Sequence, residues 1–183
     1  MRAYEPSDAE AVLAINAESE PEVGPLDREK LEFFAQNASL FLIAEARDFA
    51  GSGQVAEPGE DDEPVELDED PTVLGFLIGL DETVTGYDSN NYAWFKERFP
   101  SFGYVDRVAV STDARGKGLG PAMYRAMEAW AIGFGKGWVL AEVNTVPDNP
   151  HSHHFHQKAG FEECGRGNPY GNDQEVAYYE KQL

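Results

Sequence analysis

Apolar and polar residues follow two different periods along this chain, and their spacing predicts helices and strands in a definite order. Residues 1–6 are strand-like, and Ser7 or Asp8 then caps an apolar helix over 9–16. A second helix is predicted over 26–36, where apolar residues recur at helical spacing. The chain therefore opens with a short strand and two amphipathic helices.

Two apolar runs, at 39–47 and 72–80, have the length and the flanking residues of neighbouring strands. Between them lies Gly51–Pro71, which is rich in Asp, Glu, Gly and Pro. Its like charges and scarce apolar residues disfavour packing. We therefore expect an acidic insertion at about 51–71, which joins two hairpin strands within a single domain spanning 1–183.

The second half of the chain alternates strands with helices. A strong strand pattern covers 102–110, helical periodicity covers 119–135, and a histidine-rich helix follows the next strand. The remaining strands are predicted at 137–144, 161–166 and 175–183. Helices packed on a mixed sheet of about six or seven strands predict an α+β domain.

The composition fits a globular protein, with 42% hydrophobic and 26% charged residues. No apolar run approaches the roughly 18 residues of a membrane span, so we expect no membrane association. The N-terminus lacks an apolar signal core, and the single cysteine, Cys164, suits a reducing compartment. We therefore expect a cytoplasmic location.

The formal net charge is −20 at pH 7. This charge argues against a nucleic-acid partner, because phosphate contacts need a basic surface. It would attract a cationic partner, such as an amine or a basic peptide. Much of the excess lies in the acidic insertion, so a role in solubility is an equally open interpretation.

A glycine-rich loop follows the strand at 102–110. Gly116, Gly118 and Gly120 lead into a helix, whose N-terminal N–H groups favour an anion. Glycine lets the backbone approach a phosphate closely, and Arg115 and Lys117 add positive charge. The spacing matches neither G-x-G-x-x-G nor a P-loop. Taken alone, the loop fits a turn without a ligand equally well.

A second motif lies downstream of this loop. The chain has R-G-K-G-L-G at 115–120 and N-P-x-S-x-x-F-H-x-K-x-G-F at 149–161, with a helix and a strand between them. In this order the two motifs resemble the GCN5-related N-acetyltransferase (GNAT) superfamily. The resemblance is strong over 104–161 and weak over the rest of the chain. It implies a GNAT-like α+β fold, with a mixed sheet of about six to seven strands and about four helices.

The same resemblance implies acetyl-CoA as the acetyl donor and CoA as the product. The glycine loop would bind the pyrophosphate through backbone N–H groups, and the preceding strand would pair with pantetheine. The start of the histidine-rich helix would also contact the cofactor, although packing roles for Ser152 and Phe155 are equally open. The implied cofactor-binding residues are Val108, Ala109, Val110, Arg115, Gly116, Lys117, Gly118, Leu119, Gly120, Asn149, Ser152 and Phe155.

Acetyl transfer to a primary amine needs a base or a water relay, because such an amine is mostly protonated at neutral pH. Glu142 matches a position where some members of the superfamily carry a base glutamate. Asp106 is the rival carboxylate, and the strand period places Tyr104 on the same face. A surface or salt-bridged carboxylate is the alternative for either acid, with Arg107 as a candidate partner.

All four histidines lie within 151–156. His156 stands where many members of the superfamily carry a tyrosine that acts as general acid toward the departing thiolate. An imidazolium or a neutral ring N–H could take that role. A metal site is the competing interpretation. Zinc sites usually take ligands from several elements, and no cysteine pair or HExxH is present, so we expect no metal.

The resemblance places the acceptor between the early helices and the aromatic-rich segment at 86–102. Tyr92, Trp94 and Tyr104 are the candidate substrate-binding residues, although aromatic residues at helical spacing are usually part of a core. The expected reaction is direct acetyl transfer to a primary amine of a small molecule, a peptide or a protein. A non-catalytic acyl-CoA-binding regulatory module is the alternative. A homodimer also remains open.

Overall fold

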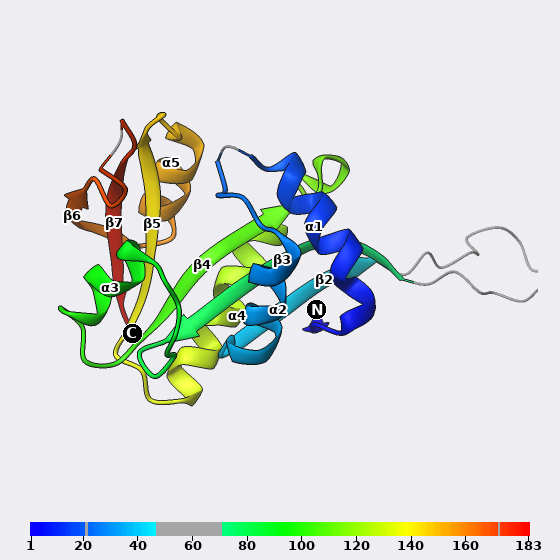
Figure 1. The fold of residues 1–183 in the computed structure, drawn as a ribbon, viewed down its shortest axis with the longest axis horizontal. Coiled ribbons are helices and arrows are strands. Elements are labelled where there is room, and N and C mark those ends of the chain that lie inside the picture. The colour runs from blue at the N-terminus through cyan, green and yellow to red at the C-terminus, as the bar shows by residue number, and fades with distance from the viewer. Residues whose placement is uncertain (21, 47–70, 172) are drawn as a thin grey trace, which may run out of the picture.

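A mixed sheet runs through the computed structural model, which describes residues 1–20, 22–46, 71–171 and 173–183 (Figure 1). Within these residues the sheet has seven strands in the order β1-β2-β3-β4-β5-β7-β6. β4 and β5 are parallel, and the other neighbouring strands are antiparallel. The strands are β1 (Arg2–Ala3), β2 (Leu40–Ala46), β3 (Thr72–Asp81), β4 (Phe102–Val110), β5 (Trp138–Val146), β6 (Glu162–Gly167) and β7 (Glu175–Gln182).

Helices cover both faces of this sheet. One core packs α1, α2 and α3 against the sheet, and a second core packs α4 and part of α5 against the other face. Figure 1 shows the first group in front of the sheet and α4 behind it. The helices are α1 (Ala9–Glu18), α2 (Arg28–Asn37), α3 (Asn90–Lys96), α4 (Leu119–Gly133) and α5 (Pro150–Lys158). The described residues thus form five α-helices where the sequence predicted about four, and the predicted GNAT-like α+β fold is confirmed.

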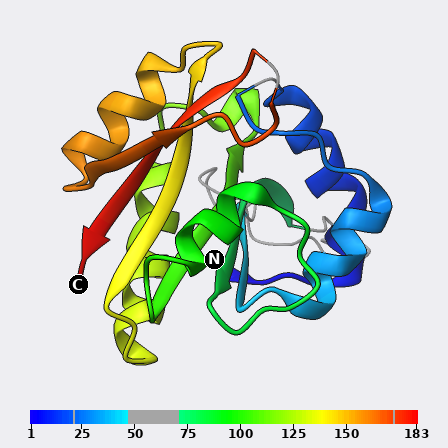
Figure 2. The ribbon, with the colours of Figure 1, turned by 60° about the vertical axis from the view of Figure 1, so that its left-hand side comes forward.

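The two parallel strands at the centre of the sheet pair along only part of their length. Pairing runs from Phe102 with Trp138 to Val105 with Ala141, and no further pair joins β4 to β5 in the described residues. Beyond this point the strands diverge, as Figure 2 shows. The two strands therefore form a fork, and backbone groups of β4 face an opening where a neighbouring strand would otherwise lie.

A β-bulge interrupts β4 at the start of the fork. Arg107 pairs with Ile78 and Val105 pairs with Gly79, so Asp106 is an additional residue on β4. Before the bulge Tyr104 faces the core of α1 to α3, and after it Ala109 faces the same core. A bulge shifts the alternation of side chains by one residue. Asp106 and Arg107 can therefore both point toward the helices of this face.

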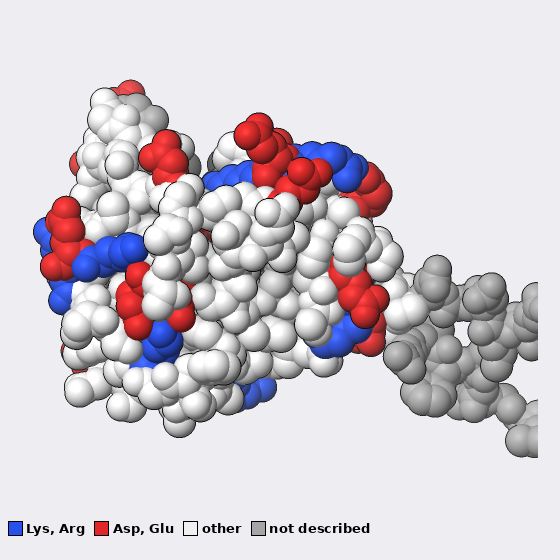
Figure 3. Space-filling view, turned by 60° about the horizontal axis from the view of Figure 1, so that its bottom comes forward, with Lys and Arg blue, Asp and Glu red and all other residues white. Residues whose placement is uncertain are grey.

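The predicted acidic insertion lies outside the described residues, apart from Pro71. In the part of the chain that is described, no helix is long and apolar enough to cross a membrane. On the face drawn in Figure 3, acidic and basic side chains lie beside one another. Pairs such as Arg2 with Glu45 and Lys136 with Asp81 show that many surface charges in the described residues are locally compensated.

Candidate active site

A cleft of about 1140 Å³ opens where β4 and β5 separate. Its walls come from the free edge of β4, the glycine loop, the start of α5, the α1–α2 connection and α2. The volume is large enough for a cofactor and a second small ligand, since pockets for drug-sized ligands measure about 300–1,000 Å³. The fork in the sheet therefore creates the principal cleft among the described residues.

Asp106 and Glu142 are the first residues of β4 and β5 beyond the last pair of the fork. Both line the cleft. Their negative charges lie close enough for Asp106 to raise the pKa of Glu142. Two carboxylates of neighbouring strands thus lie at the base of the opening, close enough to interact electrostatically.

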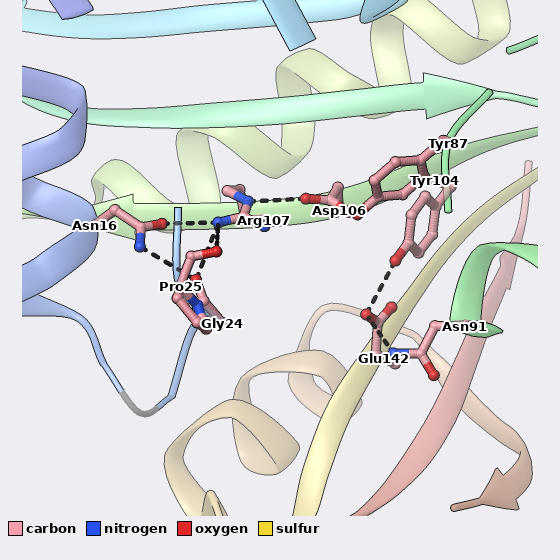
Figure 4. Close-up of polar contacts among 9 residues, drawn as sticks. All are labelled: Asn16, Gly24, Pro25, Tyr87, Asn91, Tyr104, Asp106, Arg107 and Glu142. Atoms are coloured by element: carbon pink, nitrogen blue, oxygen red, sulfur yellow. Dashed lines mark hydrogen bonds and ion pairs between the residues drawn. The ribbon is translucent and has the colours of Figure 1, made fainter. Parts of the chain in front are cut away.

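Glu142 is held by hydrogen bonds from two other elements (Figure 4). The hydroxyl of Tyr104 on β4 and the amide of Asn91 on α3 both donate to Glu142 Oε1, at 2.9 and 3.0 Å. Asn91 in turn accepts a hydrogen bond of 3.1 Å from Tyr178 on β7. Glu142 Oε2 is buried and has no hydrogen-bond partner among the described residues.

Burial raises the pKa of Glu142 to about 8, with a smaller contribution from the charge of Asp106. The hydrogen bonds from Tyr104 and Asn91 oppose this shift but do not cancel it. At neutral pH the carboxyl group is therefore mostly protonated, and it becomes a stronger base than an ordinary glutamate once it ionises.

The carboxylate of Asp106 is fully engaged with neighbouring side chains. Arg107 Nε donates to Asp106 Oδ1 at 2.8 Å, and the Tyr87 hydroxyl donates to Asp106 Oδ2. Arg107 also reaches Asn16 Oδ1 and the carbonyl oxygen of Gly24, each at 3.0 Å. This network ties β4 to α1 and to the α1–α2 connection (Figure 4), and the salt-bridged alternative for Asp106 is present in the structure.

The glycine loop forms the opposite end of the cleft. Gly116 and Gly118 have φ angles of 76° and 81°, a backbone conformation that residues with a side chain rarely adopt. Gly118 is also the N-cap of α4. A Cβ atom added at either glycine would meet nothing within 4 Å, so it is the backbone conformation that requires glycine. The loop exposes a helix N-terminus to the cleft, which is suited to an anion such as a pyrophosphate.

Nine of the twelve predicted cofactor-binding residues line the cleft. Gly118 and Leu119 do not line it, because Gly118 makes the turn and Leu119 packs on the core beneath α4. Lys117 is exposed and also lies outside the lining. The lining residues of this set are Val108, Ala109, Val110, Arg115, Gly116, Gly120, Asn149, Ser152 and Phe155.

Asn149 is the N-cap of α5, and its side-chain oxygen accepts a hydrogen bond of 3.1 Å from the Ser152 backbone N–H. Such a cap stabilises the first turn of a helix. Because the oxygen is used in this way, the amide nitrogen of Asn149 is the group that remains for a ligand in the cleft.

His156 lines the cleft but is only 3% exposed. Its Nδ1 lies 2.8 Å from the Ser152 carbonyl oxygen, so Nδ1 carries the proton and Nε2 accepts from the Tyr124 hydroxyl at 2.7 Å. Burial lowers the pKa of His156 to about 4. The ring is therefore neutral at pH 7, and both of its nitrogens are bonded within the protein.

The other histidines do not converge on a common centre. Both ring nitrogens of His153 have protein partners, the Tyr179 hydroxyl at 2.8 Å and the Asn144 carbonyl oxygen at 3.0 Å. Within the described ranges, no group of three or more His, Cys, Asp or Glu side chains is arranged to hold a metal ion. Burial raises the pKa of Cys164 to about 12, so its thiol stays protonated.

The three aromatic residues predicted to bind the acceptor do not line this cleft. The Tyr92 hydroxyl donates to the backbone carbonyl oxygens of Asp81 and Val84 in the core. Trp94 stacks on Tyr178, with ring centroids 4.0 Å apart, and borders a separate pocket of about 320 Å³. Tyr104 is buried and acts on the site through its hydrogen bond to Glu142.

The structure adds residues that the sequence did not single out. Asn91 and Tyr87 position the two carboxylates, Tyr124 binds His156, and Lys30 lines the cleft. Asn91 and Tyr87 lie in the aromatic-rich segment that was expected near the acceptor. Nothing in local spacing distinguishes them from core residues, because their partners are distant in the sequence.

The forked sheet, the glycine-capped N-terminus of α4 and the buried carboxyl group of Glu142 thus share one cleft. The Acetyltransferase (GNAT) family profile matches residues 10–161, and the chain belongs to this family. Acetyl-CoA is the acetyl donor in this family. No curated protein sequence matches the chain.

Solved structures with similar folds cover the entire chain. Ard1 from Thermoplasma volcanium aligns with a TM-score of 0.67 at 19% identity, covering 100% of this chain and 95% of its own. The ribosomal-protein-alanine N-acetyltransferase from Brucella melitensis aligns with a TM-score of 0.64 at 21% identity, covering 100% and 98%. Naa20 from Chaetomium thermophilum, in complex with a bisubstrate analogue, aligns at 0.66 and 18% identity, covering 100% and 85%. At these identities the likeness establishes the fold.

Proposed function

We propose that this protein transfers an acetyl group directly from acetyl-CoA to a primary amine that binds at the base of the fork, with Glu142 as the base. The observation that carries the proposal is the buried carboxyl group of Glu142, which lines the cleft, has a pKa of about 8 and leaves Oε2 without a hydrogen-bond partner among the described residues. A base works best when its pKa lies near the operating pH.

Asp106 is the weaker candidate for this role. Its oxygens already accept from Arg107 and Tyr87, so proton uptake would disturb a buried ion pair. Its charge instead acts on Glu142 and raises the pKa of that carboxyl. Asp106 thus supports the base rather than replacing it.

Each bond change in the proposed transfer has a group of this chain beside it. The amine nitrogen forms a bond to the acetyl carbon as the bond from carbon to sulfur breaks, and the amine proton passes to Glu142 Oε2. A backbone N–H of Val108–Val110 at the free edge of β4 stabilises the developing oxyanion. No covalent enzyme intermediate is required, and the protonated thiol of Cys164 fits this.

The Tyr124–His156 pair takes the place of the family's acid tyrosine. Because His156 is neutral and its Nε2 accepts from Tyr124, the hydroxyl of Tyr124 is the donor of this pair, and Tyr124 lines the cleft. Tyr124 donates a hydrogen bond to the departing sulfur by turning its hydroxyl away from His156 Nε2, while the ring contact with His156 holds Tyr124 in place. His156 then acts through Tyr124 rather than by direct contact.

The test compares Glu142→Gln with the native protein in assays of thiol release and of acetyl-CoA binding, with EDTA present. We expect the substitution to lower kcat by about 100-fold, in the range typical of a lost general base. Acetyl-CoA affinity should stay within about twofold. The rate of the native protein should rise with pH and level off above an apparent pKa of about 8. The rate of the variant should show no such inflection.

The matched control is Glu162→Gln, which removes an exposed carboxyl from β6 outside the cleft and should leave kcat unchanged. Equal turnover of Glu142→Gln and Glu162→Gln would exclude Glu142 as the main base. Loss of activity in EDTA would contradict a metal-free transfer. A homodimer, a cytoplasmic location and the single-domain organisation stay predictions from the sequence.

A further inference from the structure

Lys30 places an amino group on the wall of the cleft that Glu142 and Asp106 share. It lies in the first turn of α2, where its backbone N–H donates to the N-cap residue Asp27 at 2.8 Å. The side chain is partly buried, and Nζ lies 5.6 Å from the Tyr87 ring centroid and 5.7 Å from that of Phe34. Tyr87 also donates to Asp106, so Lys30 stands beside the acceptor end of the cleft.

Among the described residues, Lys30 Nζ has no hydrogen bond or ion pair, although other partly buried cations have one. Lys136 binds Asp81 and Glu82, and Lys181 binds Glu128. Burial lowers the pKa of Lys30 and the charge of Arg107 adds to this, while the charges of Asp106, Glu142 and Asp27 oppose the shift. A partly buried ammonium group without a counter-ion is costly, which a ligand of opposite charge would relieve.

The acids near Lys30 attract its ammonium group without forming an ion pair with it in the described residues. Arg107 neutralises Asp106 at 2.8 Å, and Glu142 is mostly protonated. Glu20 and Glu22 also line the cleft, but both are exposed, where water and salt screen their charge. A partly buried charge is screened less, so Lys30 can attract an anionic group in the cleft more strongly than an exposed lysine would.

We infer that Lys30 binds an anionic group of the acceptor, so that the substrate class is a primary amine carrying a carboxylate close to that amine. This inference rests on the proposed function. It is the opposite of what the net charge of −20 suggests, because Lys30 offers the cleft a cation that forms no ion pair with the described residues.

The experiment measures binding of matched acceptors to the protein saturated with CoA, so that it does not depend on turnover. The first pair of probes is the C-terminally amidated tetrapeptides Glu-Ala-Ala-Ala and Gln-Ala-Ala-Ala, and the second pair is β-alanine and its amide. Calorimetry gives the Kd ratio within each pair for the native protein, Lys30→Met, Lys30→Glu and a control variant. The control is Lys158→Gln, which removes an exposed cation from α5 outside the cleft.

We expect the native protein and Lys158→Gln to bind the acidic probe of at least one pair about tenfold more tightly than its neutral partner. Lys30→Met should abolish this preference, and Lys30→Glu should reverse it, with acetyl-CoA affinity unchanged in both. Equal affinities in the native protein, or no binding of either acidic probe, would overturn the inference. Acetylation of Lys30 itself by acetyl-CoA, detected by mass spectrometry, would also overturn the inference, because the side chain would then be an acceptor.

The same preparations are assayed for thiol release with each probe. Turnover of the neutral probes without a preference for acidic ones would reject the role of Lys30 and leave the proposed function intact. Selective binding without any turnover would support the anionic acceptor class and count against the proposed function.

Discussion

The two ends of the cleft are built in different ways. The end where we propose that the cofactor binds, the cofactor end, presents mainly backbone groups: the free edge of β4, the turn at Gly116 and Gly118, and the N-terminus of α4. The acceptor end consists of side chains that bond across the molecule. Glu142 binds Asn91 and Tyr104, which lie 51 and 38 residues away, and Arg107 binds Asn16 at a separation of 91.

The two ends therefore differ in which substitutions they can tolerate. Backbone groups at the cofactor end present the same donors whatever the neighbouring side chains are, provided that glycine allows the turn. At the acceptor end each group depends on partners from other elements, so the site is only as stable as the packing of α1, α2 and α3. The cofactor end should therefore fail through local substitutions, and the acceptor end through loss of long-range contacts.

The largest effect is expected from Arg107→Met, which removes the partner of a buried carboxylate. Arg107 and Asp106 have side chains only 4% and 3% exposed. Breaking such a pair costs about 3–5 kcal/mol, because the remaining charge is left uncompensated. Chemical denaturation measures this change in the free energy of unfolding.

Arg166→Met is the matched control for this variant. Arg166 pairs with Glu163 at 2.7 Å on the surface, with side chains 64% and 36% exposed. Exposed pairs contribute about 0–1 kcal/mol. If the two arginine variants lost equal stability, the acceptor end would not depend on its buried network, and the contrast between the two ends would disappear.

The second prediction is confined to the cofactor end. Gly118→Glu places a side chain at φ 81° and a negative charge at the N-terminus of α4. We expect acetyl-CoA to bind about 100-fold more weakly, as measured by calorimetry, because the loop changes conformation and repels the pyrophosphate. Gly133→Glu is the control, because Gly133 lies at the other end of α4 outside the cleft, has no positive φ and has open space at its Cβ. A Gly118→Glu variant with native affinity would show that the loop does not hold the cofactor.

The smallest effect concerns the pH dependence of stability. Because the pKa of Glu142 is raised from 4.5 to about 8, the folded protein keeps a proton that the unfolded chain releases across this window. Its contribution to the free energy of unfolding therefore falls as pH rises through that range. His156 acts in the opposite sense between pH 4 and 6.5, because its pKa is lowered to about 4. Between pH 6.5 and 8 the His156 effect has ended, whereas the Glu142 effect continues.

The free energy of unfolding should fall less between pH 6.5 and 8 in Glu142→Gln than in the native protein. The expected difference is about 1–2 kcal/mol, since one pKa unit corresponds to about 1.4 kcal/mol. Urea denaturation at the two pH values measures it, with Glu162→Gln as the control. An identical fall in all three proteins would mean that Glu142 ionises normally.

Much of the fold could be predicted from the sequence because its elements carry local signals. The predicted strand at 102–110 coincides with β4, and the helical spacing at 119–135 gave α4 nearly to the residue. The glycine loop was recognisable because its residues are adjacent in the chain. Local periodicity and turn chemistry are read from such short windows.

The acceptor end could be predicted only in part, because side-chain positions there depend on distant contacts. The strand period correctly placed Tyr104 and Asp106 on one face, but it puts Arg107 on the opposite face. The bulge at Asp106 brings Arg107 to the same side, and no local pattern marked it. Tyr92 and Trp94 have the composition of pocket residues, and only tertiary packing assigns them to the core and to a second pocket.

The bulge in β4 also means that chain length, as much as residue identity, encodes this site. One additional residue sets the phase of every position that follows it, so Arg107 and Ala109 face the helices while Val108 and Val110 face the other core. A substitution can be tolerated or compensated one residue at a time, whereas an insertion or deletion here would exchange the two faces of half a strand at once. The number of residues between Tyr104 and the glycine loop is therefore itself a constraint on the enzyme. Selection would act against an insertion or a deletion in this segment.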